Sequence, residues 1–171
     1  MASTTRLATY APNDVIVVIT QSSTGLSHIV GQYSEDAIVS VDRNADTFTL
    51  YTGADNSNTR IYNANTSGTV TLSLQQTSTS NDILFGLYEQ DRQSRNGLFA
   101  ISVSDKSGRS VYFAEEAYIG VVPSSAFSNS MNTRDWVIHA PNLSTEIGGN
   151  NPISAEDALA LDQLGRTVAS K

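Results

Sequence analysis

The sequence contains no cysteine, and this absence excludes several kinds of protein. Disulfide-stapled folds, cysteine-ligated zinc sites, iron–sulfur clusters and thiol catalysis all require that residue. Charged residues are also scarce, at 16% of 171 residues, where an average soluble protein has about 25%. The surface must therefore be hydrated mainly by hydroxyls and amides, and forty Ser and Thr residues supply many of them.

Basic residues are fewer than acidic ones, ten against seventeen, which gives a formal net charge of −7. Tight nucleic-acid binding relies on Lys and Arg side chains that neutralise phosphates, so this balance argues against nucleic acid as a ligand. Long hydrophobic runs are absent as well. The longest, Val15–Ile19, is far shorter than the roughly 18–20 residues of a membrane-spanning helix, and no membrane partner is expected.

Short β-branched segments separated by turn residues dominate the chain and predict a mainly β, antiparallel fold. Val70, Leu72 and Leu74 alternate with polar residues in 68–76, so one face of this strand should be buried and the other hydrated. The hydrated face carries no charge and consists of Thr69, Thr71, Ser73 and Gln75. Other strands are expected at 14–20, 27–31, 37–42, 46–52, 58–63, 98–104, 109–122 and 134–139, the last in the chain.

Turn residues suggest how some of these strands pair. Segments 37–42 and 46–52 flank an Asn- and Asp-rich turn, which predicts a hairpin or a bent pair of strands. Residues 105–108 predict a second hairpin turn.

Two helices are expected. The first should begin near Thr79–Asp82, because polar capping residues precede apolar residues that recur at helical spacing from Ile83 to Tyr88. The second, shorter helix should begin at Ser154, after a Gly- and Asn-rich linker. The chain is therefore expected to consist of a β domain in residues 1–150 and a C-terminal extension in 151–171.

A calcium site has little support. Asp42, Asn44 and Asp46 alternate as oxygen ligands do in a calcium loop. That loop needs Gly at position six and Glu at position twelve, where this chain has Thr47 and Gly53. A turn explains the same residues better, since Asn and Asp bond to their own backbone.

Catalytic residues have no better support. His28 and His139 are the only histidines, and no Gly-x-Ser-x-Gly motif accompanies them. Glu115 and Glu116 are adjacent in an expected strand, so they should face opposite sides and not share one site. We therefore expect no catalytic residue, no metal and no cofactor.

The spacing of several short motifs, taken together, resembles one protein family. The motifs lie in 10–15, 41–49, 53–55, 59–63, 67–72, 76–84 and 134–136, and the likeness ends near 148–150. Over roughly residues 8–150 the chain resembles the tail tube proteins of contractile-tailed bacteriophages. Residues 151–171 lie outside the likeness.

This resemblance implies a β-sandwich or partial barrel with one flanking helix, six copies of which form a ring. Rings are expected to stack into a hollow tube inside a contractile sheath, with strands of neighbouring subunits closing an inner β-barrel around a channel for DNA ejection. Expected partners are further copies of the chain, the tail sheath protein, and baseplate and tail terminator proteins. Tape measure protein and DNA would contact the chain only while they pass through the channel. The expected location is the virion tail, assembled in the host cytoplasm.

The resemblance implies roles for two surfaces. Thr69, Thr71, Ser73 and Gln75 would face the lumen, where neutral hydroxyls on an acidic subunit would let DNA pass without binding. Any antiparallel sheet has a hydrated face, however, so the row alone is weak support. The segments around turn 53–57 are expected to form a protruding hairpin that contacts the next ring or a neighbour. Its candidate contact residues are Phe48, Tyr51, Gly53, Asp55, Ile61 and Tyr62.

Two alternatives remain open. A tube protein of a phage-like bacteriocin or secretion apparatus would share the architecture and carry no DNA. A β-sandwich carbohydrate-binding or adhesin module would need clustered exposed aromatic residues, whereas this chain has one Trp and seven scattered Tyr.

Overall fold

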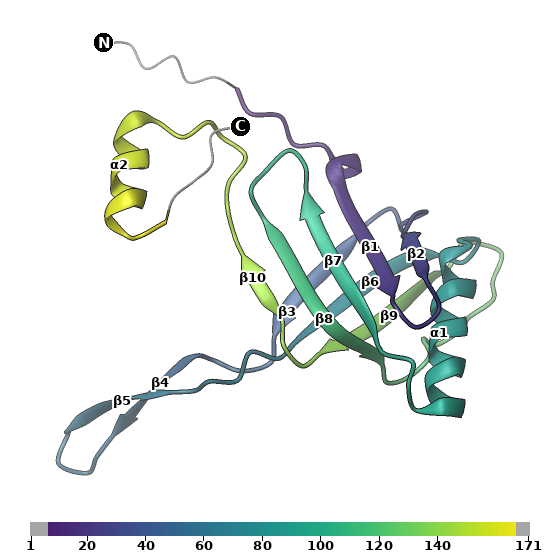
Figure 1. The fold of residues 1–171 in the computed structure, drawn as a ribbon, viewed down its shortest axis with the longest axis horizontal. Helices are drawn as coiled ribbons and strands as arrows, with labels where there is room; N and C mark the ends of the chain where they lie inside the picture. Colours follow the sequence, from purple (N-terminus) through teal and green to yellow (C-terminus); the bar gives the residue numbers. More distant parts are fainter. Residues whose placement is uncertain (1–6, 167–171) are drawn as a thin grey trace.

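The computed structural model describes residues 7–166, which form a mainly antiparallel β structure (Figure 1). The body strands are β1 (Val15–Gln21), β2 (Leu26–Ile29), β3 (Val39–Arg43), β6 (Gly68–Gln75), β7 (Phe99–Asp105), β8 (Val111–Ile119), β9 (Thr133–Ala140) and β10 (Ser144–Glu146). A separate hairpin consists of β4 (Phe48–Thr52) and β5 (Asn58–Tyr62). The helices are α1 (Ser80–Ser94) and α2 (Ala155–Gln163), and a single 3₁₀ turn, Pro12–Asp14, precedes β1.

One strand, β8, joins the two halves of the body. The strand order is β2-β1-β7-β8-β9-β6-β3, with β10 on the free side of β8. The first part of β8 pairs with β7 and β10, whereas its last two residues, Tyr118 and Ile119, pair with β9. We call β2, β1, β7, β8 and β10 the β1 half, and β3, β6, β9 and the end of β8 the β6 half.

A β-bulge marks the point where β8 changes partners. Phe99 lies opposite Ala117 and Ile101 lies opposite Ala114, so β8 contains one more residue than β7 in this interval. The extra residue falls at Glu115–Glu116, and both side chains are exposed. The expectation that they face opposite sides is therefore wrong, because a bulge interrupts the alternation of a regular strand.

The hydrophobic core contains residues from both halves and from α1. Along β6, Val70, Leu72 and Leu74 are fully buried and alternate with partly exposed polar residues, so the alternation predicted for this strand is confirmed. Leu84 and Leu87 bring α1 onto the same core. The other members are Val17, Ile19, Val30, Phe99, Ile101, Val103, Ala114, Ala117, Ile119, Trp136, Ile138, Ala140 and Leu143.

A polar cluster fixes the start of α1 against the loop that follows β2. The N–H of Ser80 donates to Ser78 Oγ at 3.2 Å, and Ser78 Oγ donates to the carbonyl of Gly31 at 2.8 Å. His28 Nε2 lies 2.9 Å from Ser80 Oγ. The predicted helix is confirmed, but Thr79 makes no side-chain capping bond, because Ser78 is the residue that reaches the free N–H group.

Two predictions about strand order are wrong. Segment 39–43 pairs with β6, and segment 48–52 pairs with β5, so the two segments do not pair with each other. Val39 and Val41 pack against the core, which draws β3 onto β6 and away from the hairpin. The strand near 134–139 is followed by β10, whose three residues carry no hydrophobic pattern that would have predicted it.

The alternation along β6 can be tested with two neighbouring substitutions. Leu72→Ala should lower the free energy of unfolding by about 2–5 kcal/mol, since it leaves a cavity in the core. Thr71→Ala, on the opposite face, should lower it by no more than about 1 kcal/mol. Urea unfolding followed by tryptophan fluorescence measures both, and equal losses would contradict the assigned faces.

Candidate assembly surfaces

The outward side of the β6 half is a polar surface centred on Thr69, Thr71, Ser73 and Gln75, all of which are partly exposed. The strand register places Ser40 and Asp42 beside this row on β3, and Thr133, Asp135, Val137 and His139 beside it on β9. We call these ten residues the polar strand face. It contains two carboxylates and no Lys or Arg, so it offers no ammonium or guanidinium group to a phosphate.

Hydrogen bonds hold the two ends of the central row. Thr69 Oγ1 donates to Asn44 Oδ1 at 2.9 Å, and Gln75 Nε2 donates to the carbonyl of Tyr33 at 3.0 Å. Beside the row, Ser40 Oγ donates to Asp42 Oδ2 at 2.9 Å. These contacts fix side chains that would otherwise be mobile, so the face is both hydrated and ordered.

The β6 half ends at an edge strand. Within residues 7–166, β3 pairs along its length only with β6, and its other side has no strand partner. An edge of this kind presents backbone N–H and C=O groups that can pair with a strand of another chain. The structure thus places an open edge directly beside the polar strand face.

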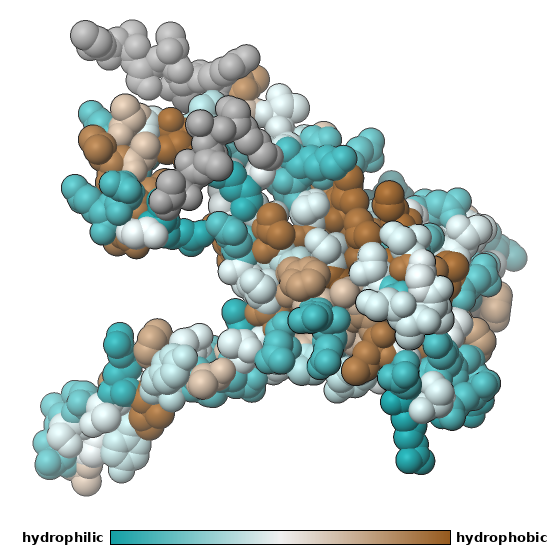
Figure 2. All heavy atoms as spheres, viewed as in Figure 1, coloured by the Kyte–Doolittle hydropathy of each residue, from teal (hydrophilic) through white to brown (hydrophobic). Residues whose placement is uncertain are grey.

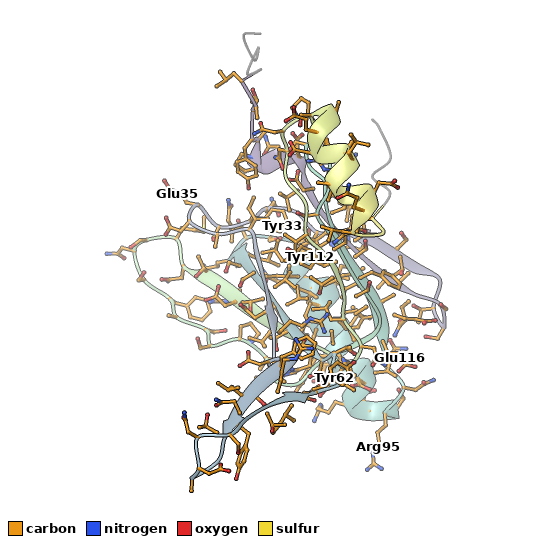
Figure 3. The ribbon with its side chains drawn as sticks, turned by 90° about the vertical axis from the view of Figure 1, so that its left-hand side faces the viewer. Tyr33, Glu35, Tyr62, Arg95, Tyr112 and Glu116 are labelled. Atoms are coloured by element: carbon orange, nitrogen blue, oxygen red, sulfur yellow. The ribbon has the colours of Figure 1, made fainter. Side chains whose placement is uncertain are left out.

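The β4–β5 hairpin projects from the body, and each of its ten strand residues is exposed (Figures 1 and 3). It nevertheless carries large hydrophobic side chains, with exposed fractions of 50% for Phe48, 71% for Leu50, 61% for Tyr51, 48% for Ile61 and 66% for Tyr62. A two-stranded hairpin on its own is at best marginally stable in water. Exposed apolar groups of this kind make the hairpin a candidate surface for contact with another protein.

Both faces of the hairpin are partly apolar. On one face the rings of Phe48 and Tyr62 lie opposite each other with centroids 5.7 Å apart, and the Arg60 guanidinium lies 4.3 Å from the Phe48 ring centre. Tyr51 and Ile61 lie on the other face. The aromatic and cation–π contacts stiffen the hairpin without burying it.

The tip of the hairpin is an Asx turn. Asp55 Oδ1 accepts hydrogen bonds from the Ser57 N–H at 3.1 Å and the Ser57 hydroxyl at 2.7 Å. The Gly53 N–H donates to the Ser57 carbonyl at 2.7 Å, and Asn56 adopts a positive φ of 64°. The Ser57 hydroxyl and then the backbone N–H hold the pKa of Asp55 below its ordinary value of 3.8.

The base of the hairpin is tied to the body by Asn and Arg side chains. Asn44 donates two hydrogen bonds to Ser67, from its N–H to the carbonyl at 3.1 Å and from Nδ2 to Oγ at 3.1 Å. Arg43 Nη1 donates to the carbonyl of Thr66 at 2.9 Å. Segment 42–46 thus serves as the connection to the hairpin. No group of three or more His, Asp or Glu residues suited to a metal ion occurs within 7–166.

The two histidines have separate surroundings. His28 bonds to Ser80 at the start of α1, and the His139 ring packs on Tyr118 with centroids 5.3 Å apart. In the described part of the chain, neither helix is long and apolar enough to cross a bilayer.

An exposed apolar row on the β1 half escaped the sequence analysis. Ile29, Val18, Ser102 and Phe113 lie side by side on the outward face, and Val111 is near them on β8. Ile29 is 66% exposed and Phe113 44% exposed. Figure 2 shows this hydrophobic surface over β1, β7 and β8. The continuous apolar run Val15–Ile19 predicted a buried strand, but it also carried the signal for this surface. Side chains alternate along a strand, so only every second residue of the run can face one core and the others must point outward.

Comparison with known proteins identifies the family. The sequence model of the Bacteriophage PhiTE tail tube protein family matches residues 7–148. The chain belongs to this tail tube family. "Structural protein ORF10" of Pseudomonas phage KPP10 is 51% identical over 162 residues, which cover 94% of each chain. The resemblance drawn from the sequence motifs is therefore confirmed, and the chain is a structural tail protein.

Solved structures share the fold at low sequence identity. The tube terminating cap of the anti-feeding prophage matches with a TM-score of 0.55 and 16% identity, covering 85% of this chain and 99% of that one. The sheath/tube terminator of the extracellular contractile injection system PVC matches with a TM-score of 0.55 and 14% identity. The match covers 82% of this chain and 99% of that one. A chain of the PVC sheath-tube complex matches with a TM-score of 0.51 and 14% identity, covering 77% of this chain and 87% of that one.

The turn at the hairpin tip makes a pH-dependent prediction. Because the pKa of Asp55 is depressed in the turn, the stabilisation it gives is present above the ordinary value and is lost as pH falls through the lowered value. A carboxyl NMR titration should therefore give Asp55 a midpoint below 3.8. Ser57→Ala should move that midpoint upward, and identical midpoints in both proteins would contradict the Asx turn.

Proposed function

We propose that this chain is the protomer of an inner tail tube, in which six copies form a ring and stacked rings enclose a channel for DNA ejection. The single observation that carries the proposal is the polar strand face beside the open edge of β3. A channel wall built from strands needs one apolar side for the protein core and one hydrated side for the lumen. The β6 half has both.

The charge of the polar strand face suits transit of DNA. Its central row, Thr69, Thr71, Ser73 and Gln75, is neutral, and Asp42 and Asp135 beside the row are acidic. Phosphates would meet hydroxyls and carboxylates but no ammonium or guanidinium group. DNA could therefore slide along such a wall without being held.

Ring closure would use the open edges. Strand addition at β3 by a neighbouring copy would extend the β6 half into a continuous inner barrel and remove an edge that invites uncontrolled pairing. The exposed hairpin, with Phe48, Tyr51, Ile61 and Tyr62 on its strands and Gly53 and Asp55 at its tip, would contact the next ring or a neighbour. We assign this tube unit to residues 1–150 and treat 151–171 as an extension.

The outer partners follow from the same arrangement. The relatives of known structure include a sheath/tube terminator and a chain from a sheath-tube complex, which supports a contractile sheath and a tail terminator as partners here. The exposed apolar row of the β1 half offers a surface for such neighbours. Baseplate and tape measure proteins complete the expected set, and we place the protein in the virion tail, assembled in the host cytoplasm.

A second candidate is a tube protein of a contractile injection system that carries no DNA. It is favoured by the shared fold with the anti-feeding prophage and PVC proteins. The 51% identity to a phage structural protein supports the phage tail instead. Detection of this chain in purified particles together with capsid protein and DNA would favour the first function, and particles without either would favour the second.

Assembly is tested by electron microscopy of the purified protein. Negative staining at high concentration should show stacked rings with a central hole, whereas a strictly monomeric protein would overturn the proposal. Deleting Gly53–Ser57 should leave the melting of the body intact, since all hairpin residues are exposed, and should block tube growth. Normal tubes from the deletion variant would show that the hairpin tip has no part in assembly.

The lumen assignment is tested by adding charge. In tubes of Thr71→Lys/Ser73→Lys, short DNA duplexes should be retained, with binding that falls at least about tenfold between roughly 50 and 200 mM salt. The control, Thr20→Lys/Ser27→Lys, adds the same charge on the exposed outward face of the β1 half. Equal retention by both variants would contradict a lumen at the polar strand face.

A further inference from the structure

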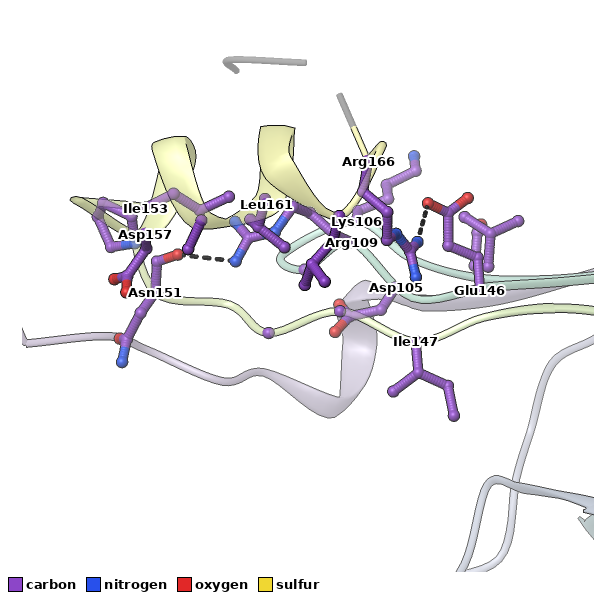
Figure 4. Close-up of a pocket in the computed structure, with 18 of the residues that line it drawn as sticks. Asp105, Lys106, Arg109, Glu146, Ile147, Asn151, Ile153, Asp157, Leu161 and Arg166 are labelled. Carbon is purple, nitrogen blue, oxygen red and sulfur yellow. Dashed lines mark hydrogen bonds and ion pairs between the residues drawn. The ribbon is translucent and has the colours of Figure 1, made fainter. Parts of the chain in front are cut away.

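The C-terminal helix α2 stands apart from the body and leaves a cleft of about 1080 Å³ between them (Figure 4). One wall is α2, and the other walls are the β7–β8 turn and the segment that connects β10 to α2. Small-molecule sites occupy about 300–1000 Å³ and are mostly enclosed. This cleft is slightly larger than that range and open, so it suits a polypeptide segment better than a small ligand.

The side of α2 that faces the cleft is largely apolar and is only partly covered by the rest of the chain. Asp157, Ala160, Leu161 and Leu164 line the cleft at the spacing of one helical face. None of the helix is buried, and Leu164 is 76% exposed. A nine-residue helix is too short to be stable in water by itself, so packing against a partner is expected to contribute to its stability.

Polar contacts at the walls hold the cleft open. Arg109 Nη2 donates to the carbonyl of Asn151 at 3.0 Å, and Arg166 Nη2 lies 2.9 Å from Glu146 Oε1. Ser154 Oγ accepts the N–H of Asp157 at 3.1 Å and caps the helix. These bonds position α2 without bringing its apolar face onto the sheet.

We propose that the cleft receives the β4–β5 hairpin of a second copy of this chain, placed in the next ring. This inference rests on the proposed tube function and adds the acceptor surface for the hairpin. The hairpin and α2 project on the same side of the molecule but at opposite ends, so they do not meet within one chain (Figures 1 and 2). Head-to-tail stacking brings two such different surfaces together.

The chemistry of the two surfaces is complementary. The hairpin offers exposed Phe48 and Leu50 to the exposed Leu164 and the partly exposed Leu161 of the cleft. The cleft lining contains three of the ten basic residues of this acidic chain, Lys106, Arg109 and Arg166. Three acidic residues, Asp105, Glu146 and Asp157, balance this charge in the lining, and Arg166 and Glu146 pair with each other. The cleft thus offers charges of both signs at its rim, which can meet both the Asp55 carboxylate and the Arg60 guanidinium of the hairpin.

The first experiment measures the critical concentration for tube assembly. Leu161→Asp and Leu164→Asp should each raise this concentration about tenfold or more. Each substitution removes an apolar side chain that would pack against the hairpin and places a carboxylate in the contact, and both changes weaken docking. The matched control is Leu159→Asp, which places the same charge on α2 at a residue that is 66% exposed and does not line the cleft. Its effect should stay within about twofold. Equal effects of all three substitutions would overturn the proposal.

The second experiment uses the absence of cysteine, which leaves no background thiols. Chains with Leu50→Cys are mixed with chains with Leu161→Cys, assembled and oxidised, and non-reducing gels should show disulfide heterodimers only after tubes have formed. The control replaces the second chain by Phe127→Cys, whose residue is 80% exposed in the loop between β8 and β9. Heterodimers at equal yield in the control would overturn the proposal.

The outcomes separate this inference from the tube function. The docking would be refuted, and the tube function would remain, if two results were found together. Tubes would form without the Leu50–Leu161 disulfide, and Leu161→Asp would affect assembly no more than Leu159→Asp. A wild-type chain that forms no tubes would refute both. A disulfide formed within monomers of a doubly substituted chain would mean that the hairpin reaches its own cleft, which also overturns the proposal.

Discussion

One core covers only one face of each body strand, and this constraint underlies both candidate assembly surfaces of the body. Val70, Leu72 and Leu74 point into the core from β6, so the residues between them must face outward. On the β6 half the outward residues are polar, and on the β1 half several are apolar. The same geometry thus produces a hydrated wall on one half and a surface that favours a protein partner on the other.

The hairpin and α2 differ from the body because no core holds them. Their positions depend on hydrogen bonds of Arg43 and Asn44 at one extension and of Arg109 and Arg166 at the other. Each such bond contributes only about 0.5–1.5 kcal/mol, and an exposed ion pair about 0–1 kcal/mol. Both extensions can therefore adjust if a neighbour covers their apolar side chains, as the proposed tube assembly would require.

Local patterns predicted the elements well where the core alone decides them. The alternation in 68–76, the helix with Leu84 and Leu87, and the strands around the 53–57 turn all follow from spacing and turn chemistry. The pairing of strands was harder to predict from the sequence, since β3 pairs with β6, which is distant in the chain, and not with the adjacent β4. The Glu115–Glu116 bulge and β10 have no sequence pattern of their own, because each exists only as a response to neighbouring strands.

The sequence by itself determined the family, through the spacing of its motifs, and the neutral character of the β6 face, because side chains alternate along any strand. Only the tertiary structure decided which surfaces remain uncovered. It placed Asp42 and Asp135 beside the neutral row, left Ile29 and Phe113 exposed, and held α2 away from the body. These outcomes depend on contacts between residues far apart in the chain, which local propensity does not encode.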